Sequence, residues 1–247
     1  MKTTMSVFRK VVFGLSTISA LFFISCNKND DNGTTIDGAG LMALNLVPDA
    51  TVSFALSGSN ITSPLTFNSY TGGYLSIFPG SRTVQAYTFD GLAAQNSINF
   101  EPGKYYSLFL IDTGTALKQV IVEDKFDTLA SSSQSLVRYV NAIESPTPAT
   151  ITVTANGTNV INEPAIFSTV SGFTPVESGS VTITLNNGSN VNVSRTISLE
   201  SRKVYTILLS GVPGETGDKA VQIKFIVNGT ADATAGRVSG SATTGVN

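Results

Sequence analysis

The 247-residue sequence has no histidine, no tryptophan and a single cysteine, Cys26. Without imidazole, and with one thiolate at most, it lacks the ligands that most zinc, copper, haem and iron–sulfur sites require. Ser-His-Asp and Cys-His catalysis are excluded for the same reason. A lone cysteine cannot form a disulfide within the chain, so stability must come from apolar burial. We therefore expect no metal, no cofactor and no enzymatic activity.

Charge is also scarce. Charged residues make up 13% of the sequence, against about a quarter in an average protein. The chain has 15 Lys and Arg against 17 Asp and Glu, and beyond the first ten residues it has no basic cluster, which argues against nucleic acid as a partner. Threonine, serine, asparagine and glycine abound instead, a composition typical of secreted β-sheet proteins.

The longest apolar run lies near the N-terminus and ends beside Cys26. Residues 1–10 are basic, and residues 11–24 are apolar but too short to span a bilayer. Ser25 is the small residue that a lipoprotein signal peptidase requires before an acylated cysteine. We predict a signal peptide over residues 1–25, acylation of Cys26, and a flexible tether over residues 26–40.

The residues after Cys26 suggest a second localisation signal. Residues 27–31 (NKNDD) resemble the lysine-and-acidic surface-export signals of Bacteroidota lipoproteins. The resemblance implies an outer-membrane lipoprotein exposed at the cell surface, with a periplasm-facing orientation as the alternative. We expect the acylated Cys26 to make the membrane a partner of the protein.

The remainder of the sequence repeats itself at a spacing of about 99 residues. Three pairs of segments match: 44–46 with 140–142, 73–74 with 172–173, and 104–110 with 203–209. We predict domains over residues 41–126 and 136–229. A linker over 127–135 joins them, and a disordered tail over 230–247 follows, in which residues 237–238 are able to pair with a sheet edge.

Each copy reads as short strands separated by turns. Val, Ile, Thr, Tyr and Phe are frequent, and many segments alternate polar with apolar residues. In the first copy we expect strands over 41–47, 51–57, 65–67, 73–77, 82–89, 94–100, 105–112 and 118–123. In the second copy the clearest are 181–185 and 220–227, with a hairpin turn at 186–188. The pattern predicts an all-β protein of two tandem antiparallel β-sandwiches, Ig-like or transthyretin-like.

Some turn and corner residues are predicted individually. Gly80 is expected at a hairpin reversal, and Asp49 and Asp112 are expected in turns. Tyr106 and Tyr205 occupy matching positions, and we expect their hydroxyls to reach backbone partners.

The repeated motifs resemble a known family. Residues 44–50 (LNLVPDA) resemble the N-x-x-P-D-A opening of the domain of unknown function 4397 family, and residues 73–80 (GYLSIFPG) resemble its later Y-x-x-v-p-a-G element. The second copy keeps residues 138–142 (RYVNA) but has Glu-Ser-Pro at 144–146 in place of Pro-Asp-Ala. The resemblance implies an exported bacterial β-sandwich, often lipid-anchored in Bacteroidota, and it assigns no catalytic residues.

A candidate calcium site and a candidate glycosylation site lie near the linker. Glu123, Asp124 and Asp127 carry oxygen ligands suited to calcium, but they lack a calcium-loop pattern, so we expect a solvated turn. Thr128 lies in an Asp-Thr-Leu triplet that resembles the O-glycosylation signal of Bacteroidota, and it is a candidate for modification.

Three aromatic residues near a loop are candidates for ligand stacking: Tyr70, Tyr74 and Phe78. Core packing is the favoured alternative for them. We expect a non-enzymatic envelope protein that binds or presents a protein or glycan ligand. The alternatives are a structural fimbrial or matrix component assembling by strand pairing, and a carbohydrate-binding accessory protein of a glycan-uptake system.

Overall fold

The computed structural model describes residues 37–126, 131–231 and 238–239. Cys26, Asp127, Thr128 and the expected signal peptide lie outside the described residues. No helix in the described part is long and apolar enough to cross a membrane. One 3-10 turn, η1 (Gly217–Lys219), interrupts a structure otherwise built from strands and loops.

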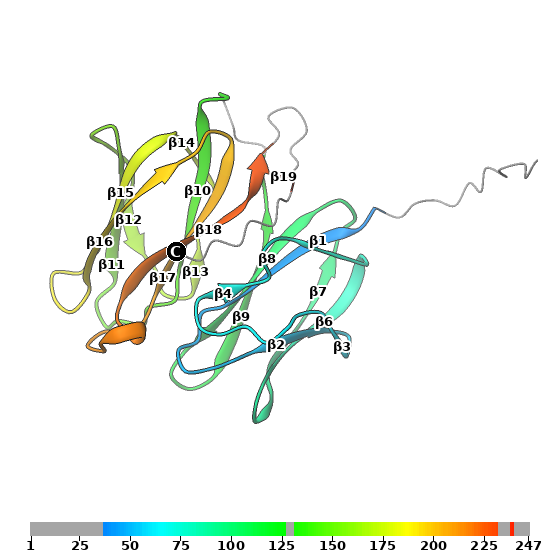
Figure 1. Ribbon diagram of the computed structural model, residues 1–247. Helices are drawn as coiled ribbons and strands as arrows, with labels where there is room; N and C mark the ends of the chain where they lie inside the picture. Colours follow the sequence, from blue (N-terminus) through cyan, green and yellow to red (C-terminus); the bar gives the residue numbers. More distant parts are fainter. Residues whose placement is uncertain (1–36, 127–130, 232–237, 240–247) are drawn as a thin grey trace, which may run out of the picture. The chain divides into compact units, whose positions relative to one another are not determined.

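The first copy is a sandwich of two sheets (Figure 1). One sheet contains β1 (Ala39–Asn45), β4 (Ser69–Tyr70), β5 (Leu75–Ile77), β8 (Tyr105–Asp112) and β9 (Leu117–Asp124). The other has the order β3 (Ser59–Asn60), β2 (Ser53–Leu56), β6 (Gly80–Thr88) and β7 (Gly91–Phe100). Alternate side chains such as Leu41, Phe54 and Leu108 fill the space between the sheets. Burial of this face explains why these segments alternate.

The second copy repeats this arrangement. One sheet contains β10 (Gln134–Asn141), β13 (Thr169–Val170), β14 (Thr174–Glu177), β17 (Lys203–Ser210), β18 (Gln222–Ala231) and β19 (Val238–Ser239). The other has the order β12 (Thr158–Ala165), β11 (Ala149–Ala155), β15 (Gly179–Asn186) and β16 (Asn192–Leu199). β10 begins inside the segment expected as a linker, and β19 pairs with β18.

The predicted all-β fold of two tandem sandwiches is confirmed, with one addition. β1 pairs with β8 in parallel, as β10 does with β17, whereas the other pairs are antiparallel. Alternation of side chains is the same in both directions of pairing, so the sequence pattern does not distinguish them. The parallel pairs bring the C-terminal ends of their strands to the same edge of the sheet.

Backbone conformation repeats with the sequence. Positive φ angles recur at the paired positions Ser57 and Asn156, Gly58 and Gly157, Gly103 and Arg202, and Gly80 and Gly179. The expected hairpin at Gly80 is wrong: Gly80 (φ 100°) opens β6 where the chain passes from one sheet to the other. The glycine supplies this left-handed conformation without a steric cost.

The middle strands are buried on both faces. β1, β8, β10 and β17 are almost fully buried, unlike the outer strands. Their second faces meet in a shared core that contains, among others, Met42, Leu44 and Phe109 of the first copy and Val140, Leu208 and Ile226 of the second. The two sandwiches therefore share buried apolar surface.

Candidate functional site

A buried polar network crosses the junction between the copies. Arg138 on β10 forms an ion pair with Asp124 at the end of β9, with Nη1 2.5 Å from Oδ1. Their side chains are 2% and 0% exposed. Arg138 Nη2 donates to Ser107 Oγ at 2.7 Å, and that hydroxyl donates to Asp124 Oδ2 at 2.6 Å. Each charge is thus paired and hydrogen-bonded, as burial requires.

A second chain of hydrogen bonds closes the network. Arg138 Nε donates to Thr206 Oγ1 (3.0 Å), which donates to Asn228 Oδ1 (2.7 Å). Asn228 Nδ2 donates to the Tyr74 hydroxyl (3.1 Å), and that hydroxyl donates to Asp124 Oδ2 (2.5 Å). Burial, and then the neighbouring Asp124 carboxylate, raise the pKa of Tyr74 well above its usual value. The network is a closed structural unit with its polar groups satisfied.

The expectation of a solvated turn is wrong for Asp124, because tertiary packing encloses it in this network. Glu123 instead points to Lys104, whose Nζ lies 3.0 Å from Oε1. Hydrogen bonds to Glu123 and Glu101 raise the pKa of Lys104. Two neighbouring acidic residues on one strand therefore have separate structural partners.

The three aromatic candidates occupy different environments. Tyr70 is partly buried against the shared core, and burial raises its pKa. Tyr74 belongs to the polar network and packs edge-on against Tyr105 and Phe126. Phe78 is 81% exposed. The structure does not bring them together as one exposed platform.

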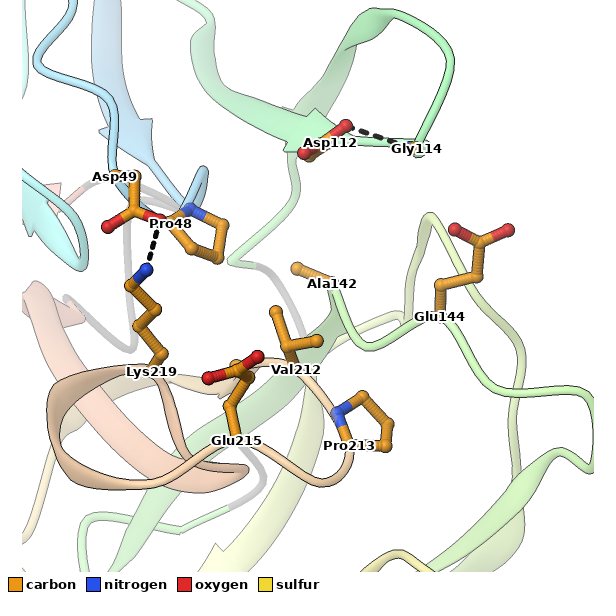
Figure 2. A pocket seen from close by; sticks show the side chains of 11 residues that line it. Pro48, Asp49, Asp112, Gly114, Ala142, Glu144, Val212, Pro213, Glu215 and Lys219 are labelled. Carbon is orange, nitrogen blue, oxygen red and sulfur yellow. Dashed lines mark hydrogen bonds and ion pairs between the residues drawn. The ribbon is translucent and has the colours of Figure 1, made fainter.

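A cleft of about 340 Å³ opens where loops of the two copies meet. Figure 2 shows residues from both copies around it. Its lining consists of Pro48, Asp49, Asp112, Gly114, Ala142, Glu144, Gly211, Val212, Pro213, Glu215 and Lys219. These residues follow β1, β10 and β17 or end and follow β8, so the parallel pairs converge on the cleft.

The cleft is rich in negative charge. Four carboxylates and one lysine line it. Lys219 of the second copy forms an ion pair with Asp49 of the first, and this contact raises the pKa of Lys219. Asp112 accepts a hydrogen bond from the Gly114 amide at 2.8 Å, which is the turn chemistry predicted for it. Glu144 and Glu215 complete the acidic lining (Figure 2).

The cleft is not visible in the sequence, because its residues come from both copies and from loops of unrelated sequence. The matching loops after β1 and β10 differ where Pro-Asp-Ala is replaced by Glu-Ser-Pro. An acidic residue follows each of β1, β10 and β17, and β8 ends in one, but the sequence does not show that these four positions meet. No group of three or more His, Cys, Asp or Glu side chains in the described ranges is arranged to hold a metal ion.

The fold and junction define a protein of two tandem, fused β-sandwiches. The family described as domain of unknown function (DUF4397) matches residues 39–147 and again residues 135–239. The chain therefore belongs to this family and contains two copies of its domain, as the motifs at 44–50 and 73–80 indicated. A search of curated proteins finds no significant match.

Proposed function

We propose that the protein is a lipid-anchored, non-enzymatic component of the cell envelope that binds a ligand in the cleft between its two copies. The cleft carries this proposal. Its volume falls within the range of small-molecule sites, about 300–1,000 Å³, and its lining mixes prolines, Val212 and Ala142 with a few polar groups. A ligand of moderate size, or a side chain of a larger one, fits such a cleft.

The lining favours a ligand with positive charge. Four carboxylates and one lysine line the cleft, and that lysine is already paired with Asp49. The remaining negative charge attracts a cation and repels anions. The loops that form its walls are attached to four strands that are buried on both faces, which limits the ordering needed on binding.

Calorimetric titration with tri-lysine as the probe tests the cleft. We expect saturable binding to the full chain that weakens about tenfold in the double variant Glu144→Gln/Glu215→Gln. The matched control Asp37→Asn/Glu200→Gln removes the same charge from exposed positions outside the cleft and should bind as the parent does. Equal binding by both double variants, or equal binding of tri-glutamate, would refute the cleft as the site.

Anchoring through Cys26 is a separate part of the proposal. It is supported by the basic segment, the short apolar run and Ser25 before the cysteine. Cys26→Ala should release the protein from membranes and abolish incorporation of labelled palmitate. A parent protein that incorporates no palmitate, or a variant that still sediments with membranes, would contradict the anchor without affecting the cleft.

The two alternative functions have less support. A fimbrial subunit that exchanges its first strand needs a removable edge strand, but β1 lies inside its sheet and is buried along its whole length. A carbohydrate module usually offers exposed aromatic rings for stacking, and of the three aromatic candidates only Phe78 is highly exposed. Ligand binding in the cleft is therefore the preferred proposal.

A further inference from the structure

The loop that follows β17 is much longer than its counterpart in the first copy. It spans residues 211–221, between β17 and β18, whereas the matching loop between β8 and β9 spans residues 113–116. Five of its residues line the cleft: Gly211, Val212, Pro213, Glu215 and Lys219. The additional length therefore gives the cleft a wall that the first copy does not match.

The backbone of this loop is held at its base. The Val212 amide donates to the Lys219 carbonyl at 2.8 Å. Gly211 (φ 108°) lies so close to Ala220 that a Cβ atom at position 211 would be 2.2 Å from the Ala220 carbonyl oxygen. Only glycine allows both the left-handed conformation and this close approach. The loop thus presents the side chain of Lys219 from a fixed backbone.

The side chain of Lys219 reaches the first copy. Its ammonium forms an ion pair with the carboxylate of Asp49, in the turn that follows β1 (Figure 2). The two side chains are 42% and 67% exposed. An ion pair this exposed contributes little net free energy, because water solvates both charges well when they separate. The pair therefore opens at little cost when another cation competes for Asp49.

A second carboxylate acts on Lys219. The hydrogen bond to Asp49 and the charge of Asp49 raise the pKa of Lys219, and the charge of Glu215 raises it further. Glu215 belongs to the same loop and lines the same cleft. It therefore continues to favour the charged ammonium of Lys219 after that group has left Asp49.

The group that Lys219 places on Asp49 indicates what this position accepts. It is a primary ammonium at the end of an unbranched aliphatic chain. Ala142, Val212 and Pro213 line the cleft together with the carboxylates, and apolar surface of this kind suits the methylene stem of a lysine side chain.

We infer that the Asp49 carboxylate is a subsite for a primary ammonium group of the ligand, such as that of a lysine side chain, and that Lys219 fills this subsite until the ligand arrives. The subsite rests on the proposed function of the cleft, and it identifies the group that the cleft selects. A filled subsite lowers the apparent affinity for the ligand. Removal of Lys219 therefore strengthens binding, whereas removal of a residue that holds the ligand weakens it.

Calorimetric titration of the full chain with tri-lysine tests the subsite. Lys219→Met removes the ammonium and should bind tri-lysine about fivefold more tightly, the ratio that loss of an exposed competing ion pair allows. The matched control, Lys125→Met, removes the same charge from an exposed position after the end of β9 that is remote from the cleft, and it should bind as the parent does. In an Asp49→Asn background, Lys219→Met should give no gain, because no carboxylate is released.

The titrations separate failure of the subsite from failure of the cleft. Absence of saturable binding to the parent would overturn the proposed ligand site and the subsite together. Binding that weakens in Glu144→Gln/Glu215→Gln, but is no tighter in Lys219→Met than in Lys125→Met, would overturn the subsite alone. A gain from Lys219→Met that persists undiminished in the Asp49→Asn background would do the same, because it would reflect net charge rather than release of Asp49.

Discussion

At the scale of single residues, the two copies differ where they meet. Arg138 occupies the position of Met42 in the first copy, 96 residues earlier, and Phe173 occupies that of Tyr74. The first copy supplies the acceptor Asp124 and the second supplies the cation. The guanidinium also lies over the Phe173 ring, 4.3 Å from its centroid. The buried pair therefore depends on divergence between the copies.

Replacing Arg138 by the methionine of the first copy should destabilise the protein strongly. Removing one partner of a buried ion pair costs about 3–5 kcal/mol, because the other charge stays buried without compensation. The double variant Arg138→Met/Asp124→Asn removes the stranded charge and should recover much of this loss. Urea unfolding of the three proteins measures the coupling. Additive effects of the two substitutions would show that Asp124 does not depend on Arg138.

Tyr74 should make stability sensitive to alkaline pH. Because its folded-state pKa is raised above that of the unfolded chain, the folded state retains its proton longer. The stabilisation is complete below a pH of about 10, the ordinary tyrosine value, and is lost as the pH rises through the folded-state pKa. Tyr74→Phe should lower stability at neutral pH by about 1–3 kcal/mol and reduce the alkaline decline. Unfolding free energies between neutral pH and pH 11 check this, and parallel curves for the two proteins would contradict it.

At the scale of elements, the two copies share loop conformations that are fixed by side-chain hydrogen bonds to the backbone. Asn45 Nδ2 donates to the carbonyls of Ala50 and Leu65 at 2.7 and 3.0 Å, and Oδ1 accepts from the Val47 amide at 2.9 Å. Asn141 makes equivalent bonds to Ala165 and Ile143. The asparagine of the family motif thus has a structural role in both copies.

The tyrosines at matching positions of the two copies, Tyr106 and Tyr205, also fix a turn by a hydrogen bond to the backbone. As predicted, the hydroxyls of Tyr106 and Tyr205 reach backbone partners, accepting from the amides of Glu101 at 3.0 Å and Glu200 at 2.8 Å. Each bond spans the turn between two strands, β7 and β8 or β16 and β17.

Tyr106→Phe and Tyr205→Phe should each lower the unfolding free energy by about 1 kcal/mol, the usual net value of one hydrogen bond. The sites belong to different copies, so the double variant should show the sum of the two effects. Tyr87→Phe is the control, because in the described chain its hydroxyl has no hydrogen-bond partner, and it should change little. A loss at Tyr87 as large as at Tyr106 and Tyr205 would argue against the corner hydrogen bonds as the cause.

At the scale of the whole described chain, the shared core joins the copies. Each middle strand contributes one face to its own sandwich and the other to the common core. The linker therefore joins two domains that cannot separate without exposing Met42, Phe109 and Leu208 to water, at a cost of about 25 cal/mol for each Å² of apolar surface.

The copies should accordingly unfold in a single transition. Leu208→Asp, which places a charge in the shared core, should reduce protection of β1 and β8 in the first copy as well as that of the second. Hydrogen exchange followed by mass spectrometry resolves peptides from both copies. Ser194→Asp on an exposed edge should leave both unchanged. Loss of protection confined to the second copy would show that the sandwiches are independent.

The sequence by itself determined the features that depend on local pattern. Period-two alternation and turn residues located most strands, and the repeat and its motifs identified the family. The matched tyrosines were predicted because a buried hydroxyl needs a partner close by. For these features, the physical cause lies within a few residues of the pattern.

Tertiary structure alone decided how the copies meet. Asp124 ends a strand in a Glu-Asp-Lys segment, and such a segment is equally typical of a solvated turn. Its burial depends on the ion pair with Arg138 of the second copy. The continuous apolar run 108–111 was the available sign of a strand buried on both faces, but it does not say what covers the second face. The parallel pairs, the shared core and the acidic cleft all arise from contacts between distant segments, and such contacts leave no periodic trace in the sequence.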